Sequence, residues 1–313
     1  MDLRQIDLNL LVSLDALLAE CNVTRAARRL HISQPALSAQ LARLRHIFDD
    51  PLLLPAEAGR GMTPTARALA LGPVLHSVLK DLESVVQYRP SFDPLTDERT
   101  FQIAANDTAM VVLGLPLIEK LASCAGPGVR VAFRNPDAGL IAAQMEGGEV
   151  DLLIASERLL PVSMKVRPLL HGSFVMAQRK GHPRGTAPLD MDAYCCLQHV
   201  LVTEFGGHFS GYIDETLAES GRHRRVVVSV EKFMLVPEIL RNSDYVCTLP
   251  SMLRSRFASV LDMFDLPFDD RGFGLRLAWH PRNHADPAVS WLRDTLVGLL
   301  DSSAAPEPDV TEA

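Results

Sequence analysis

Residues 26–38 read AARRLHISQPALS, and this stretch decides how the N-terminal part of the chain folds. Small alanines at positions 26 and 27 let two helices cross closely, and Asn22 or Thr24 can cap the first of them. The pattern breaks at residues 31–33. Ser33 can then cap a new helix with Pro35 in its first turn, where the missing N–H of proline is harmless.

The helix that begins near residue 34 has one apolar stripe and one polar face. Its stripe recurs at intervals of four, three and four residues, and consists of Leu37, Leu41, Leu44 and Phe48. At 100° per residue, Gln34, Ser38 and Arg45 lie together on the polar face. An amphipathic helix over residues 8–20 comes first, so the order is that of a helix-turn-helix. Gln34 can pair with adenine and Arg45 with guanine or phosphate, although similar helical triplets also occur in proteins that do not bind DNA.

Charge is distributed unevenly along the chain. The net charge is −7, yet residues 22–48 contain five arginines and no acidic residue, which leaves 26 basic and 38 acidic residues elsewhere. A positive patch on an acidic body attracts phosphate locally while the body repels it. A solvated basic helix face explains the same charges, and charge alone does not separate the two interpretations.

AARRL at residues 26–30, ISQPALS at 32–38 and the continuation through residue 54 resemble the DNA-binding signature of LysR-type transcriptional regulators. The resemblance implies that the second helix of the motif enters the major groove of double-stranded promoter DNA. It also implies a wing over residues 59–65, whose arginine reaches the backbone or minor groove. The expected DNA contacts are Thr24, Arg25, Ser33, Gln34, Pro35, Ser38, Arg45 and Arg60. Pro55 departs from the family, which usually has an arginine there, and puts one phosphate contact in doubt.

A long helix is expected next, over residues 64–88. Its apolar positions follow a heptad spacing and are Ala68, Leu71, Leu75, Val78, Leu82 and Val85. Gly72 and Pro73 interrupt the pattern and can bend the helix. Such a stripe can pack on its own domain. The resemblance instead favours the linker helix through which members of the family form dimers or tetramers, and two recognition helices one DNA turn apart bind more tightly than one.

The C-terminal two-thirds alternate strands and helices, at residues 99–105, 108–121, 129–134, 138–145 and 150–155, and again between 174 and 300. This order predicts mostly parallel sheets covered by helices. The expected fold class is α/β: an all-α winged helix-turn-helix (1–63), a dimerising linker helix (64–88), a hinge (89–97) and a two-lobed effector-binding domain (98–302) that resembles the periplasmic solute-binding fold. Lobe I spans about 98–167 and 268–302, lobe II spans about 168–267, and residues 303–313 form a disordered tail.

A cleft between the lobes is the expected ligand site, since such sheets bind ligands at their strand ends. Two loops that lead into helices offer free N–H groups to an anion, although the carboxylate of Asp107 would repel one. The C-terminal sequence resembles the subgroup of the family that controls nodulation and aromatic degradation, which implies a small aromatic acid or phenolic effector. The expected effector contacts are Asn106, Asp107, Thr108, Arg134, Gly206, Gly207, His208, Phe209 and Phe233. Each phenylalanine can equally belong to a core.

Other classes of protein fit the sequence less well. The serine of GHFSG at residues 207–211 is displaced by one position from a nucleophile elbow, and no helical His pair or phosphate loop occurs, so no catalytic residue, metal or cofactor is expected. A secreted solute-binding protein would need a signal peptide, which residues 1–7 do not resemble. We therefore expect a cytoplasmic regulator with no membrane segment, and a contact with RNA polymerase is compatible with it. Five cysteines without a C-x-x-C pair indicate reduced thiols; a redox role of Cys195 and Cys196, the operator and the sense of regulation stay open.

Overall fold

A computed structural model of the chain describes residues 7–57, 61–203 and 207–303. The chain divides into two compact units, Met1–Arg89 and Pro90–Ala313.

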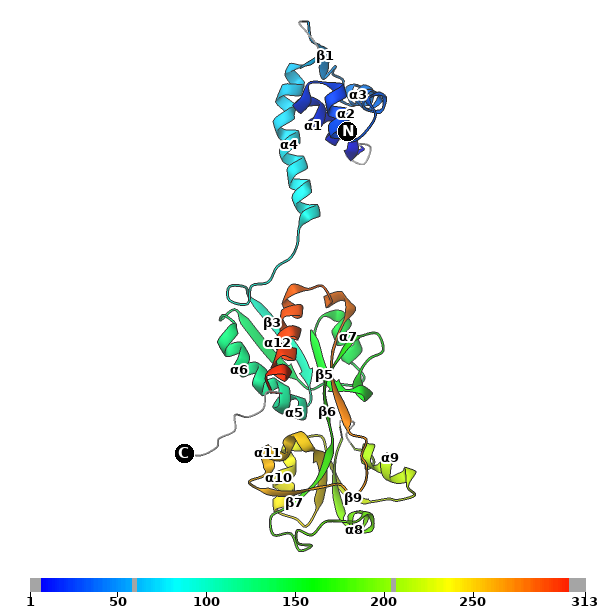
Figure 1. The fold of residues 1–313 in the computed structure, drawn as a ribbon, viewed down its shortest axis with the longest axis vertical. Helices are drawn as coiled ribbons and strands as arrows, with labels where there is room; N and C mark the ends of the chain where they lie inside the picture. The colour runs from blue at the N-terminus through cyan, green and yellow to red at the C-terminus, as the bar shows by residue number, and fades with distance from the viewer. Residues whose placement is uncertain (1–6, 58–60, 204–206, 304–313) are drawn as a thin grey trace, which may run out of the picture. The chain divides into compact units, whose positions relative to one another are not determined.

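The first unit is a winged helix-turn-helix, as the sequence predicts (Figure 1). It consists of α1 (Leu8–Glu20), α2 (Val23–Arg29), α3 (Gln34–Phe48), a hairpin of β1 (Leu53–Pro55) and β2 (Met62–Pro64), and α4 (Ala66–Gln87). Helix starts are capped by side-chain oxygens that accept backbone N–H groups, those of Asp7, Asn22, Ser33 and Thr65. Leu37, Leu41 and Leu44 of α3 are buried against α1 and α2, whereas Phe48 is only partly buried.

The apolar stripe of α4 is divided between two environments. Ala68 and Leu75 in its first half are buried in the core of the unit. In its second half Val78, Leu82 and Val85 are 49%, 42% and 71% exposed. Figure 1 shows that α4 continues well beyond the bundle of α1–α3, and among the described residues of this unit its far end is left uncovered. The sequence pattern alone does not reveal this division.

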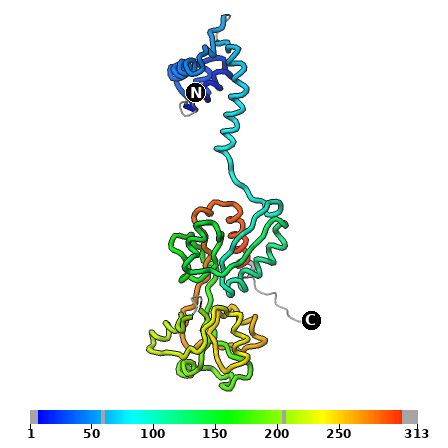
Figure 2. The backbone as a smooth tube through the Cα atoms, turned by 180° about the vertical axis from the view of Figure 1, so that it is seen from behind, coloured from blue at the N-terminus to red at the C-terminus, as the bar shows by residue number. Residues whose placement is uncertain are grey.

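The second unit contains two five-stranded sheets, one in each lobe (Figures 1 and 2). The first sheet has the order β4-β3-β5-β12-β6, with β3 (Arg99–Ala105), β4 (Val129–Arg134), β5 (Leu152–Ser156), β6 (Lys165–Gly172) and β12 (Phe273–Trp279). The second has the order β11-β7-β10-β8-β9, with β7 (Phe174–Arg179), β8 (Gln198–Val202), β9 (Arg225–Val230), β10 (Val246–Pro250) and β11 (Leu261–Asp265). In each sheet four strands run in one direction and a single strand runs against them, β12 in the first sheet and β7 in the second. Each sheet is therefore mixed, with two parallel and two antiparallel strand pairs.

Helices cover both sheets. In the first lobe they are α5 (Asp107–Ala109), a π-turn η2 (Met110–Gly114), α6 (Leu115–Cys124), α7 (Ile141–Gly147), η3 (Glu157–Leu159), η6 (Pro281–Asn283) and α12 (Pro287–Ser303). In the second lobe they are α8 (Met191–Cys196), α9 (Tyr212–Glu219), η4 (Phe233–Leu235), α10 (Val236–Arg241), η5 (Ser251–Leu253) and α11 (Arg254–Phe257). Within the described residues, none of the helices is both long and apolar enough to cross a bilayer.

The chain crosses between the lobes twice, after β6 and again between β11 and β12. Because β6 pairs with β12, residues 168–172 belong to the first lobe, and the boundary expected at residue 167 was too early. The sequence does not reveal β6 because Pro168 interrupts it, which a strand tolerates only at a sheet edge. The carboxylate of Asp270 joins the two crossings, since it accepts hydrogen bonds from the backbone N–H groups of Phe174 and Gly272.

His199 of β8 is fully buried beside the ring of Tyr194 and hydrogen-bonds the carbonyl of Tyr194 through Nε2 at 2.9 Å. Burial and the nearby positive charge of Arg224 lower the pKa of His199 to about 4. In the unfolded chain the imidazole of His199 becomes protonated near pH 6.5, whereas in the folded chain it becomes protonated only near pH 4.

We predict that the free energy of unfolding falls as the pH drops from about 6.5 to about 4, by roughly 3 kcal/mol from this group alone. Denaturant titrations of the wild type and His199→Gln across that range measure the effect, and the variant should show a shallower slope. Identical slopes would contradict the assignment.

Candidate functional site

The first candidate site is the exposed start of α3. Gln34, Pro35 and Ser38 are exposed there, whereas the leucine stripe on the other side of the helix is buried. Ser13 of α1 donates a hydrogen bond from Oγ to Oε1 of Gln40 at 2.7 Å and so fixes the rotation of α3. The surface offered to solvent carries only short or amide side chains, which lets the helix backbone approach a groove closely.

Two of the other predicted DNA contacts, Ser33 and Arg25, have partners inside the protein. The Oγ of Ser33 caps α3 by accepting the N–H of Ala36 at 3.3 Å. Arg25, exposed beside Thr24, donates from Nη2 to the backbone carbonyl of Glu20 at 2.6 Å. Arg60 lies outside the described residues.

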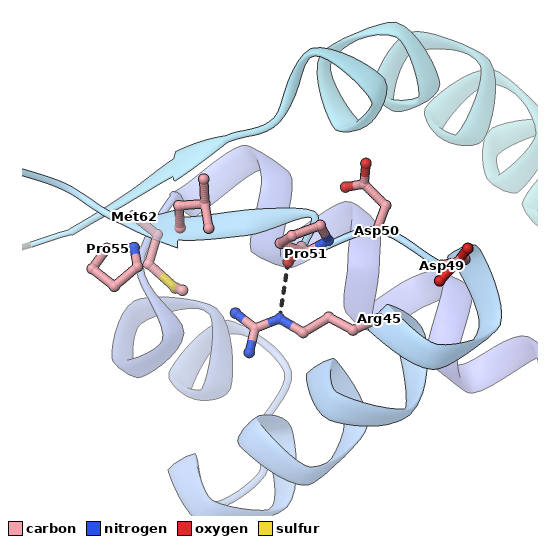
Figure 3. Close-up of a pocket in the computed structure, with 7 residues that line it drawn as sticks. Arg45, Asp49, Asp50, Pro51, Pro55 and Met62 are labelled. Atoms are coloured by element: carbon pink, nitrogen blue, oxygen red, sulfur yellow. Dashed lines mark hydrogen bonds between the residues drawn. The ribbon is translucent and has the colours of Figure 1, made fainter.

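Arg45 is held against the loop that leads into the wing (Figure 3). Its Nε donates to the carbonyl oxygen of Pro51 at 2.9 Å, and its Nη2 donates to that of Leu53 at 2.7 Å. Eleven residues of helix also place it roughly 16 Å along the axis from Gln34. Arg45 thus fastens β1 to the end of α3. The helical periodicity places Arg45 and Gln34 on one face but gives no sign of these carbonyl partners.

Asp50 strengthens the same junction. Its Oδ1 accepts hydrogen bonds from the Thr65 hydroxyl and the Leu52 N–H, both at 2.7 Å, and these bonds lower the pKa of the Asp50 carboxyl. Leu52 is held at a φ of 58°, a conformation that side chains disfavour. A shallow hollow of about 590 Å³ lies between this loop and the wing, lined by Arg45, Asp49, Asp50, Pro51, Leu54, Pro55 and Met62.

The second candidate site is a cavity of about 760 Å³ between the lobes of the second unit. The ends of β3, β5 and β8 all open into it, as expected for the carboxyl ends of parallel strands. Asn106, Asp107 and Thr108 follow β3 and line its wall. Its volume is in the range of small-molecule sites.

Aromatic side chains form one wall of the cavity. The Phe174 ring lies 4.9 Å from the ring of Phe273 and 5.7 Å from that of Tyr212. The Tyr212 hydroxyl is turned away and donates to the Asp270 carbonyl at 2.6 Å. Sequence reasoning missed all three rings, because two of them lie at the lobe crossings and only the folded topology brings them to the loops.

The charges that line the cavity are balanced. Arg158, Arg224, Arg271 and Arg276 face Asp107, Glu157, Glu215 and Glu231. Each of these arginines forms an ion pair, with Glu215, Asp214, Glu219 and Glu157 respectively. Thr108 lines the cavity, and its Oγ1 is buried without a hydrogen-bond partner among the described residues.

Arg224 forms part of the cavity wall while its side chain is only 1% exposed. It grips Asp214 through two hydrogen bonds, from Nε at 2.8 Å and from Nη2 at 2.9 Å. Asp214 also accepts the N–H of Gly211 at the start of α9. The pair therefore anchors α9 to the second lobe.

The predicted effector contacts fall into three groups. Asn106, Asp107, Thr108, His208 and Phe233 line the cavity. Gly207, Phe209 and Arg134 are exposed and do not line it. Gly206 lies outside the described residues.

Comparisons with protein families match both units. Residues 8–69 match the model described as "Bacterial regulatory helix-turn-helix protein, lysR family", and residues 96–301 match the LysR substrate binding domain.

Individual relatives match over almost the whole chain. The HTH-type transcriptional activator NagR of Ralstonia sp is 33% identical over 97% of this chain and 100% of its own length. Nodulation protein D 1 of Rhizobium tropici is 33% identical over 99% of this chain and 100% of its own. A crystal structure titled a "probable transcriptional regulator" from Pseudomonas aeruginosa has 33% identity and a TM-score of 0.61, covering 95% of this chain and 98% of that one.

We predict that Arg224→Met destabilises the protein by about 3–5 kcal/mol, because it leaves the carboxylate of Asp214 without its buried partner. Chemical denaturation of the full chain measures the change. Arg222→Met is the matched control: it breaks an exposed pair with Asp192 and should cost at most about 1 kcal/mol. Equal losses in the two variants would contradict an anchoring role.

Proposed function

The chain belongs to the LysR family of bacterial transcriptional regulators, and we propose that it recognises promoter DNA with the start of α3. We also propose that it responds to a small aromatic acid or phenol that binds in the interlobe cavity. Its relatives are transcriptional regulators rather than enzymes. As a regulator of promoters it acts where bacterial DNA lies, in the cytoplasm.

The observation that carries the DNA-reading role is the exposed, short-chained start of α3 above a buried leucine stripe. Gln34 can donate to and accept from the major-groove edge of adenine, and Ser38 lies one turn further along the same face. Arg45 serves this site indirectly by holding the wing in place, and three of its five guanidinium N–H groups are not used by these two hydrogen bonds and can contact a phosphate.

The exposed end of α4 supports pairing with a second copy of the chain. Val78, Leu82 and Val85 recur at heptad intervals and are unburied in the first unit. Two copies joined there present two recognition helices to two half-sites, which raises affinity by making the second contact intramolecular.

The aromatic wall supports a ring-bearing effector. Phe174, Tyr212 and Phe273 offer ring faces and edges, which favour stacked or edge-on aromatic partners. Thr108, whose buried Oγ1 has no hydrogen-bond partner among the described residues, is a polar residue in the wall of the same cavity. Regulation then follows from differential affinity: an effector that prefers one arrangement of the lobes shifts the population toward it, and with it the bend of the promoter.

For DNA reading we predict that Gln34→Ala reduces discrimination between an operator and random DNA by about 1–3 kcal/mol. An operator fragment selected by the protein from random-sequence DNA, followed by gel shifts against specific and random probes, measures the difference. Gln198→Ala removes an exposed glutamine of the second unit and is the control.

The contrasting variant is Arg45→Met. It should weaken binding to specific and random DNA together, because it loosens the wing rather than a base contact. If Gln34→Ala also lost both affinities equally, Gln34 would not be a base-reading residue.

For the effector we predict saturable binding of salicylate but not of glucose in isothermal titration. Phe273→Leu should weaken salicylate binding about three- to tenfold, since it removes an aromatic face and keeps apolar volume. Phe209→Leu is the control, because Phe209 is exposed and does not line the cavity. Saturable binding of the sugar alone would overturn the aromatic proposal.

A further inference from the structure

One face of helix α9 makes the contacts that leave the second lobe. Tyr212, Glu215 and Glu219 lie within about 60° of one another on the helix. The Tyr212 hydroxyl donates to Asp270, and Glu219 pairs at 2.8 Å with Arg271, both in the segment that crosses between the lobes. Glu215 pairs with Arg158, which follows β5 in the first lobe. Each of these three contacts reaches out of the second lobe.

The pair of Arg158 and Glu215 is bidentate. Nη1 of Arg158 donates to Oε1 of Glu215 at 3.0 Å, and Nη2 donates to Oε2. These hydrogen bonds lower the pKa of the Glu215 carboxyl, so the pair is ionic near neutral pH. The Arg158 guanidinium also lies 5.2 Å from the ring centre of Tyr212, and all three residues line the cavity.

The far side of α9 is fixed to its own lobe. Asp214, next to Glu215, forms the buried pair with Arg224 and caps the helix. The ion pair between Arg158 and Glu215 therefore restrains the second lobe as a whole and not α9 alone. Across the cleft, the Oδ2 of Asp107 in the first lobe accepts the N–H of Met234 in the second at 2.9 Å.

We propose that Arg158 and Glu215 form a latch that holds the two lobes in the arrangement described here. The latch controls access to the interlobe cavity, and its biological role rests on the proposed function of that cavity. The latch itself operates without any effector. The side chains are 50% and 61% exposed, so the pair biases the lobes by a modest factor, up to about fivefold. An effector anion that takes Arg158 from Glu215 would release it.

The N–H of Met234 reports lobe closure directly, because its acceptor is in the other lobe. We predict that Arg158→Gln and Glu215→Gln each accelerate hydrogen exchange of the Met234 amide, by up to about fivefold, in the effector-free full-length protein. The exchanged pair Arg158→Glu with Glu215→Arg should return the rate toward that of the wild type. Residue-resolved NMR or mass spectrometry measures the rates.

Arg254→Gln is the matched control, since it breaks an exposed pair with Asp265 that lies wholly within the second lobe and should leave the Met234 rate unchanged. Unchanged rates in both single variants, equal acceleration in the control, or no recovery in the exchanged pair would each overturn the latch. If the latch variants behave as expected but salicylate does not bind, the latch stands and the aromatic effector fails. If salicylate binds but the Met234 exchange rates of the latch variants are unchanged, the aromatic effector stands and the latch fails.

Discussion

The DNA-binding unit depends on one packing constraint: α3 must bury Leu37, Leu41 and Leu44 together. Deleting a buried leucine costs several kcal/mol, so rotation of the helix about its axis is not available to the protein. Because the rotation of α3 is fixed, the direction in which the exposed side chains at its start point is fixed as well. The hydrogen bond from Ser13 to Gln40 adds direction to packing that is otherwise non-directional.

In the effector-binding unit the corresponding constraint is electrostatic. The carboxyl ends of parallel strands from two sheets meet at one cavity, and they bring charged loops into a confined space. The guanidinium of Arg224 can be buried there because it donates two hydrogen bonds to the carboxylate of Asp214. The same aspartate caps α9, so this ion pair, together with the buried Ile213 and Leu217, sets the position of the helix and of the residues on its outward face.

Periodicity and capping residues predict many of the helices and strands, since local propensity and burial agree there: α1, β3 and β4 have the expected bounds. What the sequence could not supply is tertiary. Arg45 shares a helix face with Gln34, but its partners are the carbonyls of a loop, and no pattern encodes a carbonyl's position. Phe174 and Phe273 are about a hundred residues apart and meet only through the two lobe crossings. Of the two expected loops, residues 106–108 and His208 line the cavity, whereas Gly207 and Phe209 do not.

Two ion pairs on adjacent residues of α9 show how a switch can be built from unequal interactions. The side chain of Arg224 is 1% exposed and that of Asp214 is 18% exposed, so breaking this pair leaves a poorly solvated charge without its partner. Arg158 and Glu215 are half exposed, so water already competes for them and their exchange with another anion is nearly balanced. A ligand shifts an equilibrium only by its differential affinity for the two states, and a bias of about 1 kcal/mol lies within the range that a few hydrogen bonds supply. The helix can thus stay rigid on one side and be released on the other, which is what a rigid-body movement of one lobe requires.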